Sequence, residues 1–143
     1  MLDVKIKLLY EDSLLPIYAT DGSAGLDCFV HDWTHDELNN AEKCKLGFAI
    51  EIPKGYVGLL FPRSSVYDRH LTMANCVGVI DSDYRGEVQA RFYLGPNKNN
   101  FYTVGERCAQ LIIVPYPKIN FIISDYLTNT ERGEGGHGST GIK

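Results

Sequence analysis

The chain has 143 residues and a mass of 16.0 kDa, which fits a single domain at about 150 residues per domain. Hydrophobic residues make up 44% and charged residues 22%, so the chain can form a core without disulfides or metals and is not intrinsically disordered. The net charge of −4 is opposite in sign to that of proteins that coat nucleic acid, but it does not exclude small anionic ligands.

Segments for membrane insertion or secretion are not apparent in the sequence. The longest apolar run, Leu111-Ile112-Ile113-Val114, is far shorter than the roughly 20 residues of a membrane helix. The first residues lack the apolar stretch of a signal peptide, and the four cysteines form no CxxC pair. We therefore expect an intracellular protein, cytoplasmic or, in a eukaryote, nuclear, with reduced thiols and with neither membrane nor nucleic acid as a partner.

The apolar residues recur mainly with a period of two, which is the pattern of a strand with one buried face. This alternation predicts strands at residues 2–8, 46–52, 88–94 and 119–123. Continuous apolar runs predict strands buried on both faces at residues 56–61, 76–80 and 111–114. Turn residues separate these segments, so the sequence predicts an all-β sandwich or barrel, with short helices at most at residues 36–43 and 64–70.

A charged stretch at residues 31–40 contains two histidines four residues apart. His31 and His35 are flanked by acidic residues and could imitate one face of a metal-binding helix. Because no third ligand lies near them in sequence, an exposed loop is favoured over a metal site.

The segment Pro62-Arg63-Ser64-Ser65 follows a predicted buried strand and can open a short helix. Free backbone amides, two hydroxyl groups and a guanidinium together are able to bind phosphate oxygens. The alternative is that Ser64 only caps the turn. The local sequence leaves both interpretations open.

Residues 78–86 lie between two apolar strands and are predicted to form a hairpin with carboxylates and a tyrosine at its tip. Carboxylates at turns commonly satisfy the amides of the turn itself. A carboxylate next to a bound polyphosphate can instead orient or deprotonate a water molecule.

The C-terminal residues 133–143 contain five glycines and only one aliphatic residue, Ile142, so they cannot cover a core. Residues 132–141 nearly match the spacing of a P-loop, but Ser139 stands where the lysine should be, and no βαβ pattern surrounds it. We therefore divide the chain into a domain at residues 1–132 and a mobile arm at residues 133–143, whose glycines and hydroxyl groups suit a polyphosphate.

Five segments, taken in order, resemble the five motifs of the trimeric dUTP pyrophosphatase (dUTPase) family. They are residues 19–27, 62–65, 75–86, 105–111 and 132–141. The resemblance implies a jelly-roll β-barrel that assembles as a homotrimer with shared active sites. It also implies hydrolysis of dUTP to dUMP and pyrophosphate, with Mg²⁺ held by the triphosphate, which keeps uracil out of DNA and supplies the precursor of thymidylate.

The resemblance also assigns roles to individual residues. Asp81 would polarise the attacking water, Tyr84 would stack under the deoxyribose, and Asp27 would reach Mg²⁺ through water. Uracil would be recognised by Asn75 and by the backbone of Val79 and Ile80. Phosphate oxygens or the catalytic water would be held by Arg63, Ser64, Ser65 and Gln110, and the β- and γ-phosphates by Arg132, Gly138, Ser139 and Thr140.

Two positions depart from the family pattern. His137 stands where the fifth motif usually has a phenylalanine lid over uracil, and an imidazole stacks with less area and can carry charge. Ser65 stands where the second motif usually has glycine.

A non-catalytic nucleotide-binding or signalling module is the alternative from another functional class, and a dCTP deaminase is a weaker one, because we expect a different hairpin from residues 78–86 in that enzyme.

Overall fold

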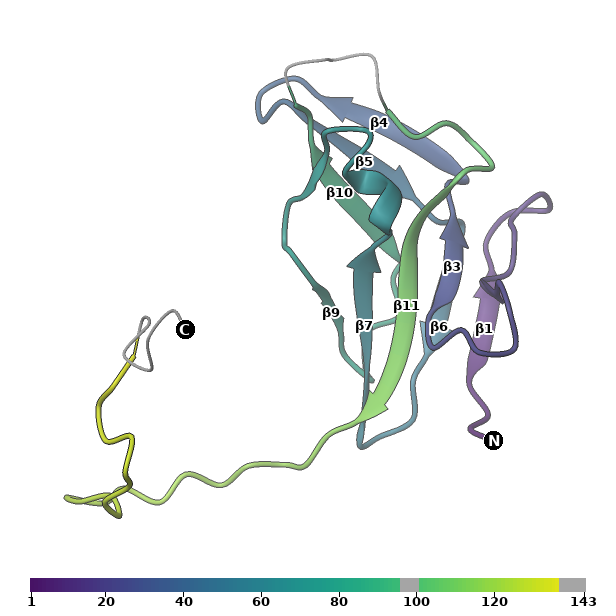
Figure 1. The fold of residues 1–143 in the computed structure, drawn as a ribbon. Coiled ribbons are helices and arrows are strands. Elements are labelled where there is room, and N and C mark those ends of the chain that lie inside the picture. Colours follow the sequence, from purple (N-terminus) through teal and green to yellow (C-terminus); the bar gives the residue numbers. More distant parts are fainter. Residues whose placement is uncertain (96–100, 137–143) are drawn as a thin grey trace.

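A computed structural model describes residues 1–95 and 101–136 of the chain (Figure 1). Eleven strands and one short 3-10 helix form within these residues. In chain order they are β1 (Lys5–Leu8), β2 (Ile17–Tyr18), β3 (Leu26–Phe29), β4 (Asp32–Asp36), β5 (Ala41–Lys45), β6 (Phe48–Glu51), β7 (Tyr56–Pro62), η1 (Ser64–Val66), β8 (Thr72–Met73), β9 (Gly78–Ile80), β10 (Gln89–Tyr93) and β11 (Arg107–Pro115).

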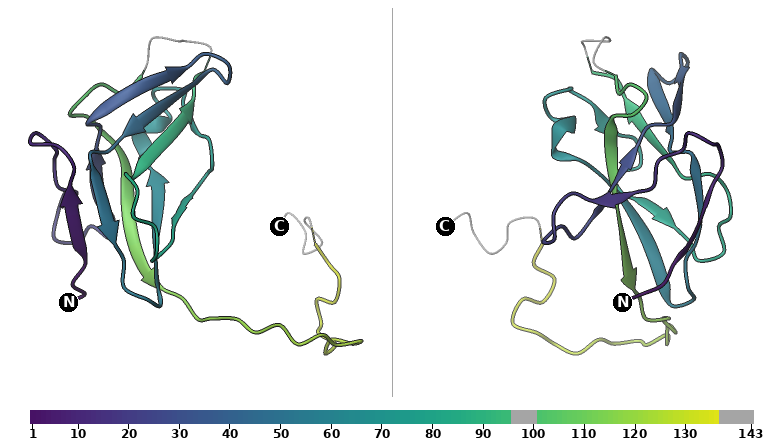
Figure 2. Two further views of the ribbon diagram at one scale, coloured as in Figure 1. Left: turned by 180° about the vertical axis from the view of Figure 1, so that it is seen from behind. Right: turned by 90° about the vertical axis from the view of Figure 1, so that its right-hand side faces the viewer.

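The strands form three sheets in which every pairing is antiparallel. The five-stranded sheet has the order β2-β3-β11-β7-β9, and the four-stranded sheet has the order β4-β5-β10-β8. A third sheet pairs β1 with β6. Figure 2 shows the sheets wrapping around a common interior, and the all-β prediction is confirmed as a jelly-roll-like β-barrel.

The core lies between the sheets and follows the predicted alternation. All four apolar residues of the set at 46–52 are buried, and so are those of the set at 88–94. Alternate residues of a strand point to opposite faces, so each of these strands contributes one apolar face to the interior. The set at residues 2–8 is less well covered, because Leu2 and Leu8 remain 41% and 39% exposed.

Both helix predictions are corrected by the structure. Residues 36–43 form the end of β4, a turn and the start of β5, so no helix exists there, and the exposed loop favoured at residues 31–40 is instead largely strand β4 and this turn. Residues 64–70 contain only η1, followed by a turn that ends in a hydrogen bond from the His70 amide to the Tyr67 carbonyl (3.0 Å).

Beyond β11 the described chain leaves the barrel. Residues 116–136 extend away from the sheets without forming a strand (Figure 1), so the strand predicted at 119–123 is wrong for a single chain. A strand needs a hydrogen-bonded neighbour, and no described strand pairs with this segment. Within the described residues, no helix has the length and apolar character that crossing a membrane requires.

Candidate functional site

A pocket of about 410 Å³ opens beside β9. Its lining contains five of the residues singled out in the sequence, namely Asn75, Val79, Ile80, Asp81 and Tyr84. These five predicted residues therefore lie on one contiguous surface. Glu87, Gln89 and Arg91 also line it and had been assigned no role. Gln89 and Arg91 could have been identified from the sequence, because they are the polar residues that alternate with the buried residues of β10 and so face away from the core.

Strand β9 is the edge strand of the five-stranded sheet, with β7 as its described partner. On an edge strand, backbone groups that point away from the neighbour are free to bind a ligand. Gly78 lies so close to the sheet that a Cβ there would approach Leu60 Cβ at 3.2 Å and Asn75 Nδ2 at 3.3 Å. The absence of a side chain at Gly78 thus allows the Asn75 amide to lie against the start of β9.

The segment after β9 differs from the predicted hairpin. Strand β9 pairs with β7, whereas β10 pairs with β5 and β8, so β9 and β10 belong to different sheets. Residues 81–88 form a loop that crosses between these sheets and follows the pocket. This loop is held by its own bonds: the Tyr84 amide donates to the Asp81 carbonyl (3.1 Å), and the Tyr84 hydroxyl donates to the Glu87 carbonyl (3.0 Å).

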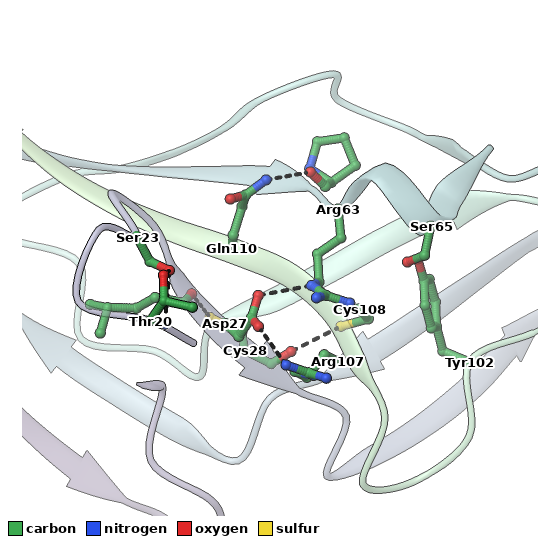
Figure 3. A network of polar contacts seen from close by, with 12 residues as sticks. Thr20, Ser23, Asp27, Cys28, Arg63, Ser65, Tyr102, Arg107, Cys108 and Gln110 are labelled. Atoms are coloured by element: carbon green, nitrogen blue, oxygen red, sulfur yellow. Dashed lines mark hydrogen bonds and ion pairs between the residues drawn. The ribbon is translucent and has the colours of Figure 1, made fainter. Parts of the chain in front are cut away.

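A second polar cluster lies where β3, β7 and β11 meet (Figure 3). The buried Asp27 carboxylate accepts one hydrogen bond from Arg63 Nε (2.8 Å) and another from Arg107 Nη1 (3.1 Å). Two positive charges are thus gathered around one negative charge, which suits a site for an anionic ligand. Arg107 lies within the fourth motif, yet the sequence reasoning gave it no role.

Gln110 brings the first, second and fourth motifs into contact. Its Nε2 donates to the Pro62 carbonyl (3.1 Å; Figure 3). A Cβ on Gly25 would lie 2.7 Å from its Oε1. Ser64 begins η1, but the N-cap residue is Arg63 and no side chain caps the turn. The capping interpretation of Ser64 is therefore not supported, and this exposed side chain is left free for other contacts.

The pocket and this second cluster lie at opposite ends of β7. Ile80 pairs with Gly58, so Asp81 follows at the level of Val57, whereas Arg63 comes directly after the other end of β7. Arg63 is itself extended (φ −85°, ψ 158°), and the chain from Val57 to Arg63 spans about 20 Å. Asp81 and Arg63 of one chain are therefore too far apart to act on the same phosphate.

Of the arm residues predicted to bind the nucleotide, only Arg132 lies within the described residues. Arg132 is exposed, and its Nε donates to the Gly135 carbonyl (2.9 Å). His137, Gly138, Ser139 and Thr140 lie outside the described residues.

The possible metal ligands are dispersed. Within residues 1–95 and 101–136, no group of three or more His, Cys, Asp or Glu side chains could hold a metal ion. His31 stacks on Tyr10 with the ring centres 4.2 Å apart, and its Nδ1 lies 3.6 Å from Asp12. Each Asp27 oxygen keeps a second lone pair beside its guanidinium bond, so this carboxylate can accept a hydrogen bond from a water molecule bound to a cation.

The chain is similar to known proteins over nearly all of its length. The family model described as dUTPase matches residues 11–141. The deoxyuridine 5'-triphosphate nucleotidohydrolases of a Hydrogenobaculum species and of Hahella chejuensis are 41% and 42% identical to it over 140 and 144 residues. These alignments cover 96% of this chain in both cases, and 97% and 93% of the two relatives.

Solved structures show the same architecture. The dUTPase of Staphylococcus bacteriophage 80alpha with dUPNHPP has a TM-score of 0.84 and 28% identity, covering 99% of this chain and 100% of that one. A mutant dUTPase of the S. aureus phage phi11, whose structure concerns the coordination of a structural Mg(II) ion, has a TM-score of 0.74 and 25% identity. That likeness covers 87% of this chain and 98% of the phage protein.

Proposed function

This chain belongs to the dUTPase family and hydrolyses dUTP to dUMP and pyrophosphate, and we propose that it does so in sites shared between copies of the chain. The reaction removes a nucleotide that would introduce uracil into DNA and supplies dUMP for thymidylate synthesis. The observation that carries the proposal is the separation of Asp81 from Arg63 along β7. A single phosphate chain must meet both groups, so they come from different copies.

Uracil binds in the pocket beside β9. Asn75 and the backbone at Val79 and Ile80, on the edge strand β9, offer donors and acceptors to the edge of the base. Cytosine carries an amino group where uracil has a carbonyl, and a buried mismatch of this kind is costly. Tyr84 lies along the same pocket and stacks under the deoxyribose, where its ring occupies the space of a 2′-hydroxyl.

Asp81 is the general base. Its side chain is exposed at the pocket, directly after β9, and it is free of ion pairs in the described part of the chain. The carboxylate takes a proton from a water molecule whose oxygen forms a bond to the α-phosphorus. The bond between that phosphorus and the oxygen bridging to the β-phosphate breaks, so pyrophosphate leaves and dUMP remains.

The phosphate chain is bound by a neighbouring copy. Arg63, Ser64, Ser65 and Gln110 of that copy hold phosphate oxygens or the attacking water, and Arg107 adds charge beside Asp27. The arm supplies Arg132 together with Gly138, Ser139 and Thr140 for the β- and γ-phosphates, and His137 stacks on the uracil. A homotrimer satisfies these requirements with three equivalent sites.

Exposed apolar side chains also favour assembly. In the segment that leaves the barrel, several large apolar residues are between 73% and 98% exposed, namely Ile119, Phe121, Ile122, Ile123, Tyr126 and Leu127. An apolar surface of this kind marks a site of contact with another chain. The alternation at residues 119–123 suits a strand that is completed by a neighbouring copy.

Mg²⁺ would be held mainly by the triphosphate oxygens of dUTP. When bound, it neutralises charge on the phosphate chain. Asp27 is the residue of this chain that would contact the hydration shell of the ion, while the same carboxylate keeps Arg63 and Arg107 in place.

Pyrophosphate release should be measured with dUTP, dTTP, dCTP and UTP as substrates. We expect an appreciable rate of pyrophosphate release with dUTP and not with the other three nucleotides. Ammonia release from dCTP would instead indicate a deaminase, and dUTP binding without any product would indicate a non-catalytic module.

A further inference from the structure

Arg69 connects two segments that the proposed function places at the phosphates. It lies in the turn after η1 and reaches the loop at residues 101–107, which leads into β11. One guanidinium nitrogen donates to the Phe101 carbonyl, and the other donates to Glu106 Oε1 at 2.5 Å. A guanidinium presents its donors in a fixed plane, so a lysine could not reproduce both bonds at once.

The loop that Arg69 holds is itself anchored to the barrel. The Val30 amide donates to the Glu106 carbonyl (2.9 Å), and the Gly105 amide donates to the Val30 carbonyl (2.7 Å). Glu106 Oε2 accepts a bond from the Thr103 amide (2.7 Å). Burial raises the pKa of Glu106, but the bonds from Thr103 and Arg69 together hold this pKa below its usual value, so Glu106 is an anionic partner for Arg69.

Arg69 also packs on a buried aromatic ring that reaches the second motif. Its guanidinium carbon lies 4.5 Å from the ring centre of Tyr102, which is 1% exposed. A cation over an aromatic face is attracted by the negative charge of that face. The Tyr102 hydroxyl lies 3.5 Å from the Ser65 hydroxyl (Figure 3), so the same ring meets both Arg69 and a residue of η1.

The position of these contacts in the fold suggests their role. The ladder between β7 and β11 ends at the pair Pro62 and Ala109, and beyond it η1 and the loop at 101–107 separate. Arg69 bridges this gap on the far side of η1. The sheet therefore fixes one end of the segment at residues 63–70, and Arg69 fixes the other.

We propose that Arg69 is a positioning residue that holds Ser64 and Ser65 at the correct place relative to Gln110 for binding the triphosphate. The inference rests on the proposed function, because it assumes that these residues bind phosphate. Arg69 itself contacts no substrate. Its loss lets η1 shift, and a displacement of about 1 Å at such a site can cost up to about 100-fold.

The experiment compares two ligands by calorimetry, dUMP and the non-hydrolysable α,β-imido analogue of dUTP, on the full chain. In Arg69→Met we expect affinity for the imido analogue to fall about 10–100-fold, while affinity for dUMP changes less than about threefold. Glu106→Gln keeps the shape of the partner and should show a smaller loss of the same kind, which preserves the test if Arg69→Met does not fold. Lys5→Met is the matched control, since it breaks the exposed Lys5–Glu51 ion pair far from this region.

One result would overturn the positioning role of Arg69, and a different result would overturn the binding of phosphate by residues 63–65. If Arg69→Met keeps the wild-type preference for the imido analogue, or loses affinity for both ligands equally, Arg69 does not position the phosphate site. If the wild type itself binds dUMP as tightly as the imido analogue, residues 63–65 do not bind the phosphate chain, and both the assignment and the inference are overturned.

Discussion

Asp81 and Arg63 stand at opposite ends of β7, about 20 Å apart along the strand. The reaction requires the water-activating carboxylate and the phosphate-binding groups to meet at one triphosphate. The fold of a single chain therefore separates these two residues, and in the proposed assembly they meet at one site.

Asp81→Asn should abolish turnover while leaving nucleotide affinity nearly unchanged. Asparagine has almost the same size but cannot accept a proton from water, and general-base assistance contributes about 10²–10⁴-fold to a rate. Turnover and calorimetric affinity for the imido analogue should be measured on the same preparation. A variant that retains more than about a tenth of the wild-type kcat would remove Asp81 from the role of base.

Tyr84→Ala should weaken discrimination against UTP more than it weakens use of dUTP. The ring lines the pocket, and rejection of a 2′-hydroxyl is steric, so removing the ring relieves it by about 1–3 kcal/mol. Tyr84→Phe is the matched control, because it keeps the ring and loses only the hydrogen bond to the Glu87 carbonyl. An unchanged ratio of kcat/KM for dUTP and UTP in the alanine variant would mean that another group recognises the sugar.

Glu42 should make stability depend on pH. It is fully buried, neither carboxylate oxygen has a hydrogen-bond partner among residues 1–95 and 101–136, and burial raises its pKa to about 7. The folded state therefore holds this proton more tightly than the unfolded chain, so stability declines as pH rises from about 4.5 to 7, by at most about 3 kcal/mol.

The measurement is the unfolding temperature of the wild type and of Glu42→Gln between pH 5 and pH 8, at one protein concentration. The glutamine variant cannot ionise, so its stability relative to the wild type should improve toward pH 8. A constant difference between the two proteins across this range would show that Glu42 does not titrate.

Deleting residues 133–143 should leave the fold and the assembly intact but abolish activity. These residues have one aliphatic side chain to bury, and in the proposed site they supply phosphate donors and exclude water. Sedimentation and turnover should be compared in the truncated and complete chains. Full activity in the truncated chain would contradict the role of the arm.

Within the arm, His137→Phe should bind dUTP at least as tightly as the wild type and His137→Ala more weakly.

Much of the barrel could be predicted because its core strands alternate strictly. Phe48 and Phe92 are fully buried, as their places in the two alternating sets require. The strands β4 and β5 could not be predicted in this way, because β4 has an exposed, mostly polar sequence and β5 buries the ionisable side chain of Glu42. A buried carboxylate breaks the pattern that distinguishes the two faces of a strand.

The candidate site, like the barrel, could be predicted from the sequence only in part. Residues 75–84 are close in sequence, so their common pocket could be predicted from the motif they form. The hydrogen bonds from Arg63 and Arg107 to Asp27 join residues 36 and 80 positions apart, and they follow only from the neighbouring places of β3, β7 and β11. The alternation at residues 119–123 indicates a strand, but no strand in the described part of the chain pairs with this segment.

Mixing two inactive variants tests the shared site most directly. Asp81→Asn and Arg63→Ala chains, each without activity alone, should be unfolded together at equal concentration and refolded. Sedimentation equilibrium should give about three times the 16.0 kDa chain mass for each preparation. If each site takes Asp81 from one copy and Arg63 from another, random mixing restores about a quarter of the wild-type sites. Mixed assemblies of the same mass that remain inactive would contradict the account, because they would show that both residues must belong to one chain.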